Sequence, residues 1–402
     1  MRSRLGLQTT RTAALFLFSV LAGSMLAMPA SAQRYTVYDI GTLGGPSSAI
    51  FYMSPEGVVT GTSSLPDGTS HGFRLSGFGP LTAANSLGGL GGSFAFAGEI
   101  NSRGDIVGIA TPPPVGNAAR RAVVFRADGT VTDLGALAGS SRGFGINDAG
   151  DVVGHTGVPD GTDLHAFVAP GGGPMIDLGT FGGAFSEATD INNAGVIVGT
   201  AENAAGVRRA FRHVGTGPLN AATDDLGTFG GAGSVGRFIS ESGVILGQAQ
   251  TADGAFHAFR LVGPGPLNAA TDDLGVVSGF TNSVAWSMNQ SGDLILGELY
   301  NTNLPNSTNH AFVWDAVNGM RDLNTLLDPG TGAGWELVQA RGASADGSLI
   351  AGWGFHNGAP RGFILQAQKV IPEPGTLALA ASSLLSLVGV LVRRQRHGGH
   401  VT

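Results

Sequence analysis

The chain of 402 residues contains no cysteine. This absence excludes disulfide bonds, thiolate catalysis and cysteine-ligated zinc or iron–sulfur sites. Lysine is nearly absent too, because Lys369 is the only one. The end segments 1–32 and 375–402 hold 6 of the 22 basic residues and no acid. The segment between these ends therefore has 16 basic and 29 acidic residues, a net charge of −13. We do not expect so acidic a segment to bind nucleic acid.

Long apolar runs are missing except near the two ends. The first, residues 13–26, follows three arginines and precedes the small residues Ala30 and Ala32. This order of basic, apolar and small-residue zones predicts a secretory signal peptide over residues 1–32. We expect signal peptidase to cleave after Ala32.

The second apolar run, residues 375–392, carries no charge. Its 18 residues would span about 27 Å as a helix, close to the ~30 Å of a bilayer core. We therefore predict a linker at 368–374, a transmembrane helix at 375–392 and a basic cytoplasmic tail at 393–402, with the body of the protein outside. The motif residues on either side of the helix are Pro372, Glu373, Pro374, Arg393, Arg394 and Arg396.

This order of Pro-Glu-Pro, apolar helix and arginine cluster resembles the PEP-CTERM sorting signal of Gram-negative bacteria. The resemblance implies that an exosortase acts at or near Pro-Glu-Pro and moves the body to the cell surface, usually in species that make exopolysaccharide. The chain departs from the family pattern in that residues 397–402 follow the basic cluster.

Glycine is abundant, with 67 residues, and it marks the turns of an internal repeat. An Asp-Leu-Gly element, with variants, returns after 47, 47, 44, 48, 48 and 49 residues, beginning at Asp39, Ser86, Asp133, Asp177, Asp225, Asp273 and Asp322. A period of this length is typical of propellers and solenoids.

Each repeat contains four short strand-like runs, the first two joined by an Asn-x-x-Gly hairpin. We therefore predict an all-β fold, a seven-bladed β-propeller of four-stranded repeats over residues 33–367. The chain begins with a fourth strand at 35–41 and ends with a third strand at 361–365, so the N-terminal strand can complete the last blade. An open β-solenoid, the alternative, would leave both ends as unpaired edges.

A His-Ala-Phe element occupies the third strand, as at His165, His257 and His310, and arginine replaces the histidine in other repeats. Together with the Asp-Leu-Gly and Asn-x-x-Gly elements it resembles the extracellular HAF repeat family, over roughly residues 35–365. That resemblance implies a repeat fold and export but no particular activity.

A position that alternates between histidine and arginine does not suit a metal ligand or a catalytic base. We interpret these residues as structural hydrogen-bond donors and expect His165 to bond Asp177. No catalytic residue, metal site or cofactor is predicted.

All four tryptophans lie in the last two repeats. Trp335 and Trp353, with Tyr300 and Phe355 nearby, are the candidate ligand surface, because aromatic faces stack on sugars and peptides. Packing in the core is the competing interpretation for these side chains.

These patterns predict an exported, non-enzymatic surface or matrix protein with a binding or structural role. Its expected partners are signal peptidase, exosortase, and extracellular polysaccharide or surface proteins, and the C-terminal helix would hold it in the membrane before processing. The alternatives are a propeller enzyme acting on extracellular glycans and a channel that binds a small ligand or metal. A converging set of channel-facing acids and histidines would favour the enzyme, and the repeat-equivalent placement of the present ones does not.

Overall fold

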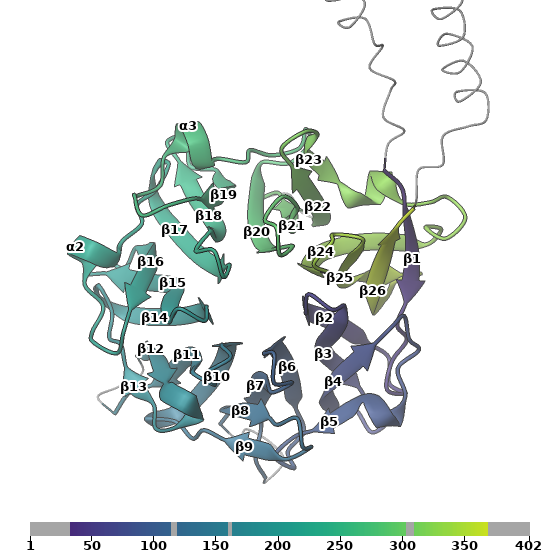
Figure 1. Cartoon of the computed structure of the whole chain (residues 1–402), viewed down its shortest axis with the longest axis horizontal. Coiled ribbons are helices and arrows are strands. Elements are labelled where there is room, and N and C mark those ends of the chain that lie inside the picture. The colour runs from purple at the N-terminus through teal and green to yellow at the C-terminus, as the bar shows by residue number, and fades with distance from the viewer. Residues whose placement is uncertain (1–32, 114–118, 160–162, 303–308, 369–402) are drawn as a thin grey trace, which may run out of the picture. The chain divides into compact units, whose positions relative to one another are not determined.

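The chain forms an all-β propeller in which antiparallel sheets surround a central channel and successive strands lie progressively farther from it (Figure 1). The computed structural model describes residues 33–113, 119–159, 163–302 and 309–368. Residues 35–367 make up the propeller unit.

The strands fall into four classes by their distance from the channel. The innermost strands are β2 (Ser48–Met53), β6 (Ala95–Ile100), β10 (Ala138–Ile146), β14 (Gly182–Ile191), β17 (Gly230–Ile239), β20 (Asn282–Met288) and β24 (Trp335–Ala343). The second strands are β3 (Val58–Ser64), β7 (Ile106–Ala110), β11 (Val152–Gly157), β15 (Val196–Asn203), β18 (Ile245–Thr251), β21 (Ile295–Tyr300) and β25 (Leu349–His356). The third strands are β4 (Ser70–Ser76), β8 (Arg121–Phe125), β12 (Leu164–Ala169), β16 (Arg208–Val214), β19 (Phe256–Leu261), β22 (His310–Asp315) and β26 (Ala359–Ala367). The outer strands are β1 (Tyr35–Asp39), β5 (Ser86–Gly88), β9 (Val131–Asp133), β13 (Ile176–Asp177) and β23 (Gly319–Asp322).

The prediction of seven separate four-stranded blades is wrong. The described strands form six hydrogen-bonded sheets, of which four have four strands, one has three and one has seven. Five sheets are thus separate blades. The seven-stranded sheet spans two successive repeats, because a parallel pair between Leu164 and Phe185 joins β12 to β14.

The outer strand is missing where a helical turn takes its place. The turns α2 (Ala221–Asp224) and α3 (Ala269–Asp272) directly precede Asp225 and Asp273, and each aspartate keeps only one bridge to its neighbour. Asn220 and Asn268 cap the N-termini of these turns. Other short turns are η1 (Ala83–Asn85), η2 (Pro170–Gly172) and η3 (Leu323–Leu326).

The N-terminal strand joins the last sheet, as predicted. β1 pairs antiparallel with β26 in the register Val37 to Leu365, which gives the sheet order β1-β26-β25-β24. The two ends of the propeller unit are therefore hydrogen-bonded to each other, and neither is left as an open edge.

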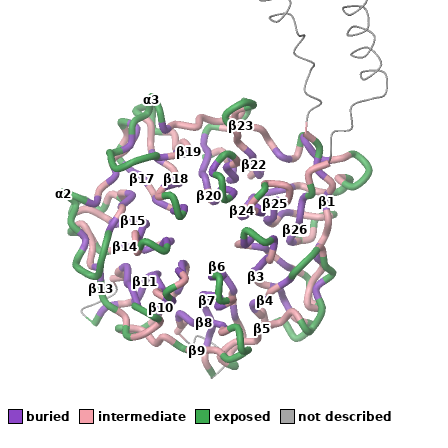
Figure 2. Tube along the Cα trace, viewed as in Figure 1, coloured by how far each residue is buried: buried purple, intermediate pink, exposed green. Residues whose placement is uncertain are grey.

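The core lies between the sheets, where the second strands are largely buried (Figure 2). The phenylalanine of the third strand is fully buried, as for Phe167, Phe211 and Phe259. Each packs on a glycine of the second strand. A Cβ on Gly199 would lie 2.0 Å from the carbonyl oxygen of Glu187 and 2.8 Å from the ring of Phe211, so only glycine fits there.

A buried serine ties several innermost strands to the third strand of the preceding repeat. The Ser186 hydroxyl donates to the carbonyl of Gly179 and accepts from the amide of Ala166, 2.7 Å away. Ser48, Ser141, Ser234 and Ser283 make the same pair of bonds. These bonds fix the innermost strands and thereby the wall of the channel.

No helix among the described residues is long and apolar enough to cross a membrane. The described residues thus form an all-β propeller and contain no transmembrane helix. The predicted signal peptide at 1–32, the motif Pro372 to Pro374, the helix at 375–392 and the tail at 393–402 lie outside the described residues.

Candidate ligand-binding channel

Each innermost strand carries a β-bulge before its hairpin, where its register with the second strand shifts. A bulge leaves a residue unpaired and re-aims its side chain. The residues within these shifts line one cavity in the channel: Phe51, Gly98, Phe144, Thr189, Arg237, Trp286 and Arg341.

These bulge positions differ in chemistry, although the strands that carry them are equivalent. They hold aromatic rings, guanidinium groups, a hydroxyl and a glycine, whereas the third strand repeats phenylalanine and the second strand repeats glycine. Packing alone accounts for the repeated positions. The varied ones give the channel an asymmetric surface that can distinguish between ligands.

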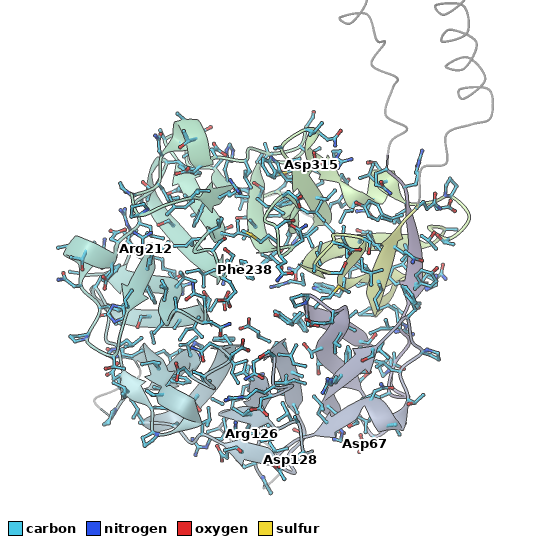
Figure 3. All side chains as sticks on the ribbon, in the orientation of Figure 1. Asp67, Arg126, Asp128, Arg212, Phe238 and Asp315 are labelled. Atoms are coloured by element: carbon cyan, nitrogen blue, oxygen red, sulfur yellow. The ribbon has the colours of Figure 1, made fainter. Side chains whose placement is uncertain are left out.

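The cavity has a volume of about 350 Å³. Its wall combines further aromatic residues, such as Tyr52, Phe96 and Phe238, with charged side chains. Figure 3 shows Phe238 beside the central opening, whereas Asp67, Asp128 and Asp315 lie toward the outer part of the ring. A mixture of aromatic faces and fixed charges can bind a polyhydroxylated ligand that also carries charge.

One side of the cavity holds a carboxyl pair. Glu99 on β6 and Asp190 on β14 hydrogen-bond to each other, while Glu99 accepts from the amide of Ile146 at 3.0 Å and Asp190 from that of Ile239 at 2.8 Å. Burial raises the pKa of Asp190 to about 6, and burial together with the charge of Asp190 raises the pKa of Glu99 well above its ordinary value. The hydrogen bond to Asp190 raises the pKa of Glu99 further and lowers that of Asp190, so it favours Glu99 as the neutral member of the pair.

A third acid, Glu187, lies in the same wall but is fully ionised. Its carboxylate is 3.1 Å from Nδ1 of His155 and 3.8 Å from Nη1 of Arg237. Burial acts to raise its pKa, but the hydrogen bond and charge of His155 and the charge of Arg237 hold that pKa below its ordinary value. The pKa of Glu187 therefore favours its ionised form, whereas the raised pKa of Glu99 favours its neutral form.

Another part of the cavity wall is built around Trp286, whose ring stacks with two guanidinium groups. The Arg341 carbon Cζ is 3.6 Å from the ring centroid and that of Arg237 is 4.5 Å from it. The indole Nε1 donates to Glu298 at 3.3 Å. Trp286 is thus held at its edge and presents a fixed platform to both cations.

The predicted ligand surface is placed elsewhere, and its binding role stays a prediction. Trp335 stacks on His356 with centroids 4.6 Å apart, and the Tyr300 hydroxyl donates to Gln248 at 3.1 Å. Trp353 contacts Phe355 edge to face and donates through Nε1 to Gln339 at 2.7 Å. None of these four side chains lines the channel cavity.

The histidines of the repeat have the structural role that their pattern indicates. His165 lies 3.0 Å from Asp177, and His257 and His310 contact Asp273 and Asp322 in the same way. Where arginine replaces histidine, Arg209 makes an ion pair with Asp225 at 3.1 Å.

The channel acids and arginines were not singled out from the sequence. Each lies a fixed number of residues before a hairpin residue, namely Asn101, Asn192, Ser240 or Ser344. Aligning the repeats on the hairpin rather than on Asp-Leu-Gly therefore brings the channel positions into register. Among the described residues, no group of three or more histidine, aspartate or glutamate side chains has a geometry that would hold a metal ion.

Comparison with known proteins gives no relative in sequence: no protein-family model matches the chain, and no curated protein does. Among solved structures, an oligogalacturonate lyase from Vibrio parahaemolyticus aligns at 10% identity and a TM-score of 0.49, covering 85% of this chain and 92% of its own. TolB from Acinetobacter baumannii aligns at 11% identity and 0.35, covering 89% and 70%. A gluconolactonase from Xanthomonas campestris aligns at 11% identity and 0.37, covering 68% and 86%. These similarities are too low to support a statement about activity.

Proposed function

We propose that this chain is an exported cell-surface or matrix protein whose propeller binds an extracellular saccharide in its channel without cleaving it. The binding role rests on the bulge positions of the innermost strands. The strands are otherwise equivalent, yet these positions present different aromatic and charged side chains to one cavity. Aromatic faces bind the apolar faces of pyranose rings, and the charged groups bind hydroxyl or acidic substituents.

The binding experiment compares two pairs of substitutions against purified exopolysaccharide from the producing cells. Phe144→Ala with Phe238→Ala removes two rings of the channel, and Trp353→Ala with Phe355→Ala removes two rings of the surface predicted from the sequence. We expect only the first pair to abolish retention on the polysaccharide. The reverse pattern would move the site to the second surface, and retention by both pairs would contradict saccharide binding through either.

Export and sorting rest on the sequence patterns at the two ends. The proposal is that signal peptidase cleaves after Ala32 and that exosortase processes the chain near Pro374. Mass spectrometry of the protein released from the surface should find an N-terminus at Gln33 and a C-terminus near Pro374. A chain that is intact through Thr402 would contradict processing.

Cleavage of an extracellular glycan is the second candidate, and one observation favours it. The carboxyl pair of Glu99 and Asp190 is a convergence of channel acids, and a protonated carboxyl group is what general acid catalysis of glycosidic cleavage requires. Release of reducing ends from the polysaccharide by the wild type, lost in Glu99→Gln, would establish this activity. No release by the wild type would leave binding alone.

A further inference from the structure

Two arginines share one aromatic platform in the channel. Arg237 on β17 and Arg341 on β24 both stack on Trp286 of β20, so three sheets contribute to one cluster. Stacking uses the face of a guanidinium group and leaves its N–H bonds pointing outward in the plane of the group. The two cations are therefore fixed in position and retain donors for a further partner.

The two arginines have few direct contacts with carboxylates. Nε and Nη2 of Arg341 donate to the neutral oxygen of Gln339 at 2.9 and 2.6 Å. Among the described residues, no carboxylate forms an ion pair with Arg341. Arg237 has one, Glu187 at 3.8 Å, which also bonds His155 at the shorter distance of 3.1 Å.

Burial lowers the pKa of Arg341, and the charge of the nearby Glu298 acts to raise it. The Glu298 carboxylate is already hydrogen-bonded to other side chains. It accepts hydrogen bonds from Gln339 at 2.6 Å, from Trp286 at 3.3 Å and from Asn309. Glu298 thus fixes the neighbours of Arg341 and makes no direct ion pair with it.

One buried donor of the cluster has no hydrogen-bond acceptor in the described part of the chain. The Nε atom of Arg237 is shielded from solvent and has no hydrogen-bond acceptor among the described residues. Burial also lowers the pKa of Arg341 to about 9, so the group remains protonated at neutral pH. A buried cation without a full counter-charge is costly, and an anion from a ligand would offset that cost.

We propose that Arg237 and Arg341 on Trp286 form an anion subsite, so that the saccharide bound in the channel is acidic and places a carboxylate or sulfate group there. The Phe51 ring, 5.7 Å from the Arg341 guanidinium carbon, borders the same subsite. This inference rests on the proposed saccharide-binding function and names the class of its ligand.

The test is calorimetric titration of the propeller protein with a glucuronate oligosaccharide and with the glucose oligosaccharide of the same linkage and length. We expect the acidic ligand to bind about tenfold tighter or more, and Arg341→Gln to remove that preference. Arg212→Gln is the matched control, because Arg212 lies outside the cavity and its Nη1 donates to the carbonyl of Gly263 at 2.9 Å. Its preference for the acidic ligand should persist.

Equal affinity for the two oligosaccharides, or an unchanged preference in Arg341→Gln, would overturn the proposal. Inorganic sulfate separates this inference from the proposed function. If neither oligosaccharide binds but sulfate raises the melting temperature of the wild type and not of Arg341→Gln, the anion subsite stands and the saccharide function falls. If sulfate also has no effect, both fall. Arg341→Lys keeps the charge and shows whether a loss in Arg341→Gln reflects misfolding.

Discussion

The carboxyl groups of Glu99 and Asp190 hydrogen-bond to each other although their strands, β6 and β14, are separated by β10. The contact is possible because the equivalent position of β10 is Gly145. A Cβ there would lie 2.8 Å from Cα of Asp190. The missing side chain leaves room for the two acids to meet in the wall of the channel.

The carboxyl pair should make stability depend on pH. The pKa values of Glu99 and Asp190 are raised on folding, so the folded state binds protons more tightly than the unfolded chain. The free energy of unfolding therefore falls as pH rises from about 4 through about 6, the window of Asp190, and further as Glu99 ionises.

Glu99→Gln should weaken this pH dependence, because an amide can donate to Asp190 without ionising. We expect a gain in stability at pH 7 to 8, about 1.4 kcal/mol for each unit of pKa shift that is removed. Urea unfolding between pH 4 and 8 measures it, and Glu56→Gln on an exposed hairpin is the control. A decline as steep as that of the wild type would show that Glu99 does not carry the effect.

Gly145→Ala should separate the two acids. The added methyl group collides with backbone atoms of Asp190 and Ile191, at 2.8 and 3.1 Å, so β10 or β14 must shift. We expect a loss of about 1–3 kcal/mol in the free energy of unfolding, as for other overpacked sites. In Glu99→Gln/Gly145→Ala the penalty should persist, since it arises from the backbone and not from the acids.

Gly199→Ala should destabilise the propeller through the core. Its Cβ would meet the carbonyl of Glu187 and the ring of Phe211, neither of which can move freely in a packed sheet. A loss of about 2 kcal/mol or more is expected in chemical denaturation. Gly217→Ala is the matched control, because a Cβ added at Gly217 would have no atom within 4 Å. Equal stability of the two variants would refute the packing argument.

Asp177→Ala should lower stability by about 1 kcal/mol, because it removes the partner of His165 and the acceptor for the Gly179 amide. Asp133→Ala removes only the corresponding turn bond to Gly135. The difference between their melting temperatures isolates the histidine–aspartate pair. Identical losses would assign the whole effect to the turn.

The sequence by itself determined the repeat and its strand classes, because turn residues and apolar runs are local and recur with one period. It also determined the pairing of the strands at the two ends of the propeller unit. It also indicated the partner of His165, since both residues belong to the repeated elements. The number of separate blades was wrong, because the joining of β12 to β14 through Leu164 and Phe185 depends on where two strands lie in space.

Only the tertiary structure identified the channel site. Glu99, Asp190, Arg237 and Arg341 belong to different repeats, and each alone resembles an ordinary polar residue of a strand. Bulges in the innermost strands help to direct the side chains at these positions toward one cavity. The absence of a side chain at Gly145 allows Glu99 and Asp190 to touch. A bulge is a property of strand pairing, so the meeting of these side chains is decided by the closed ring and not by any single repeat.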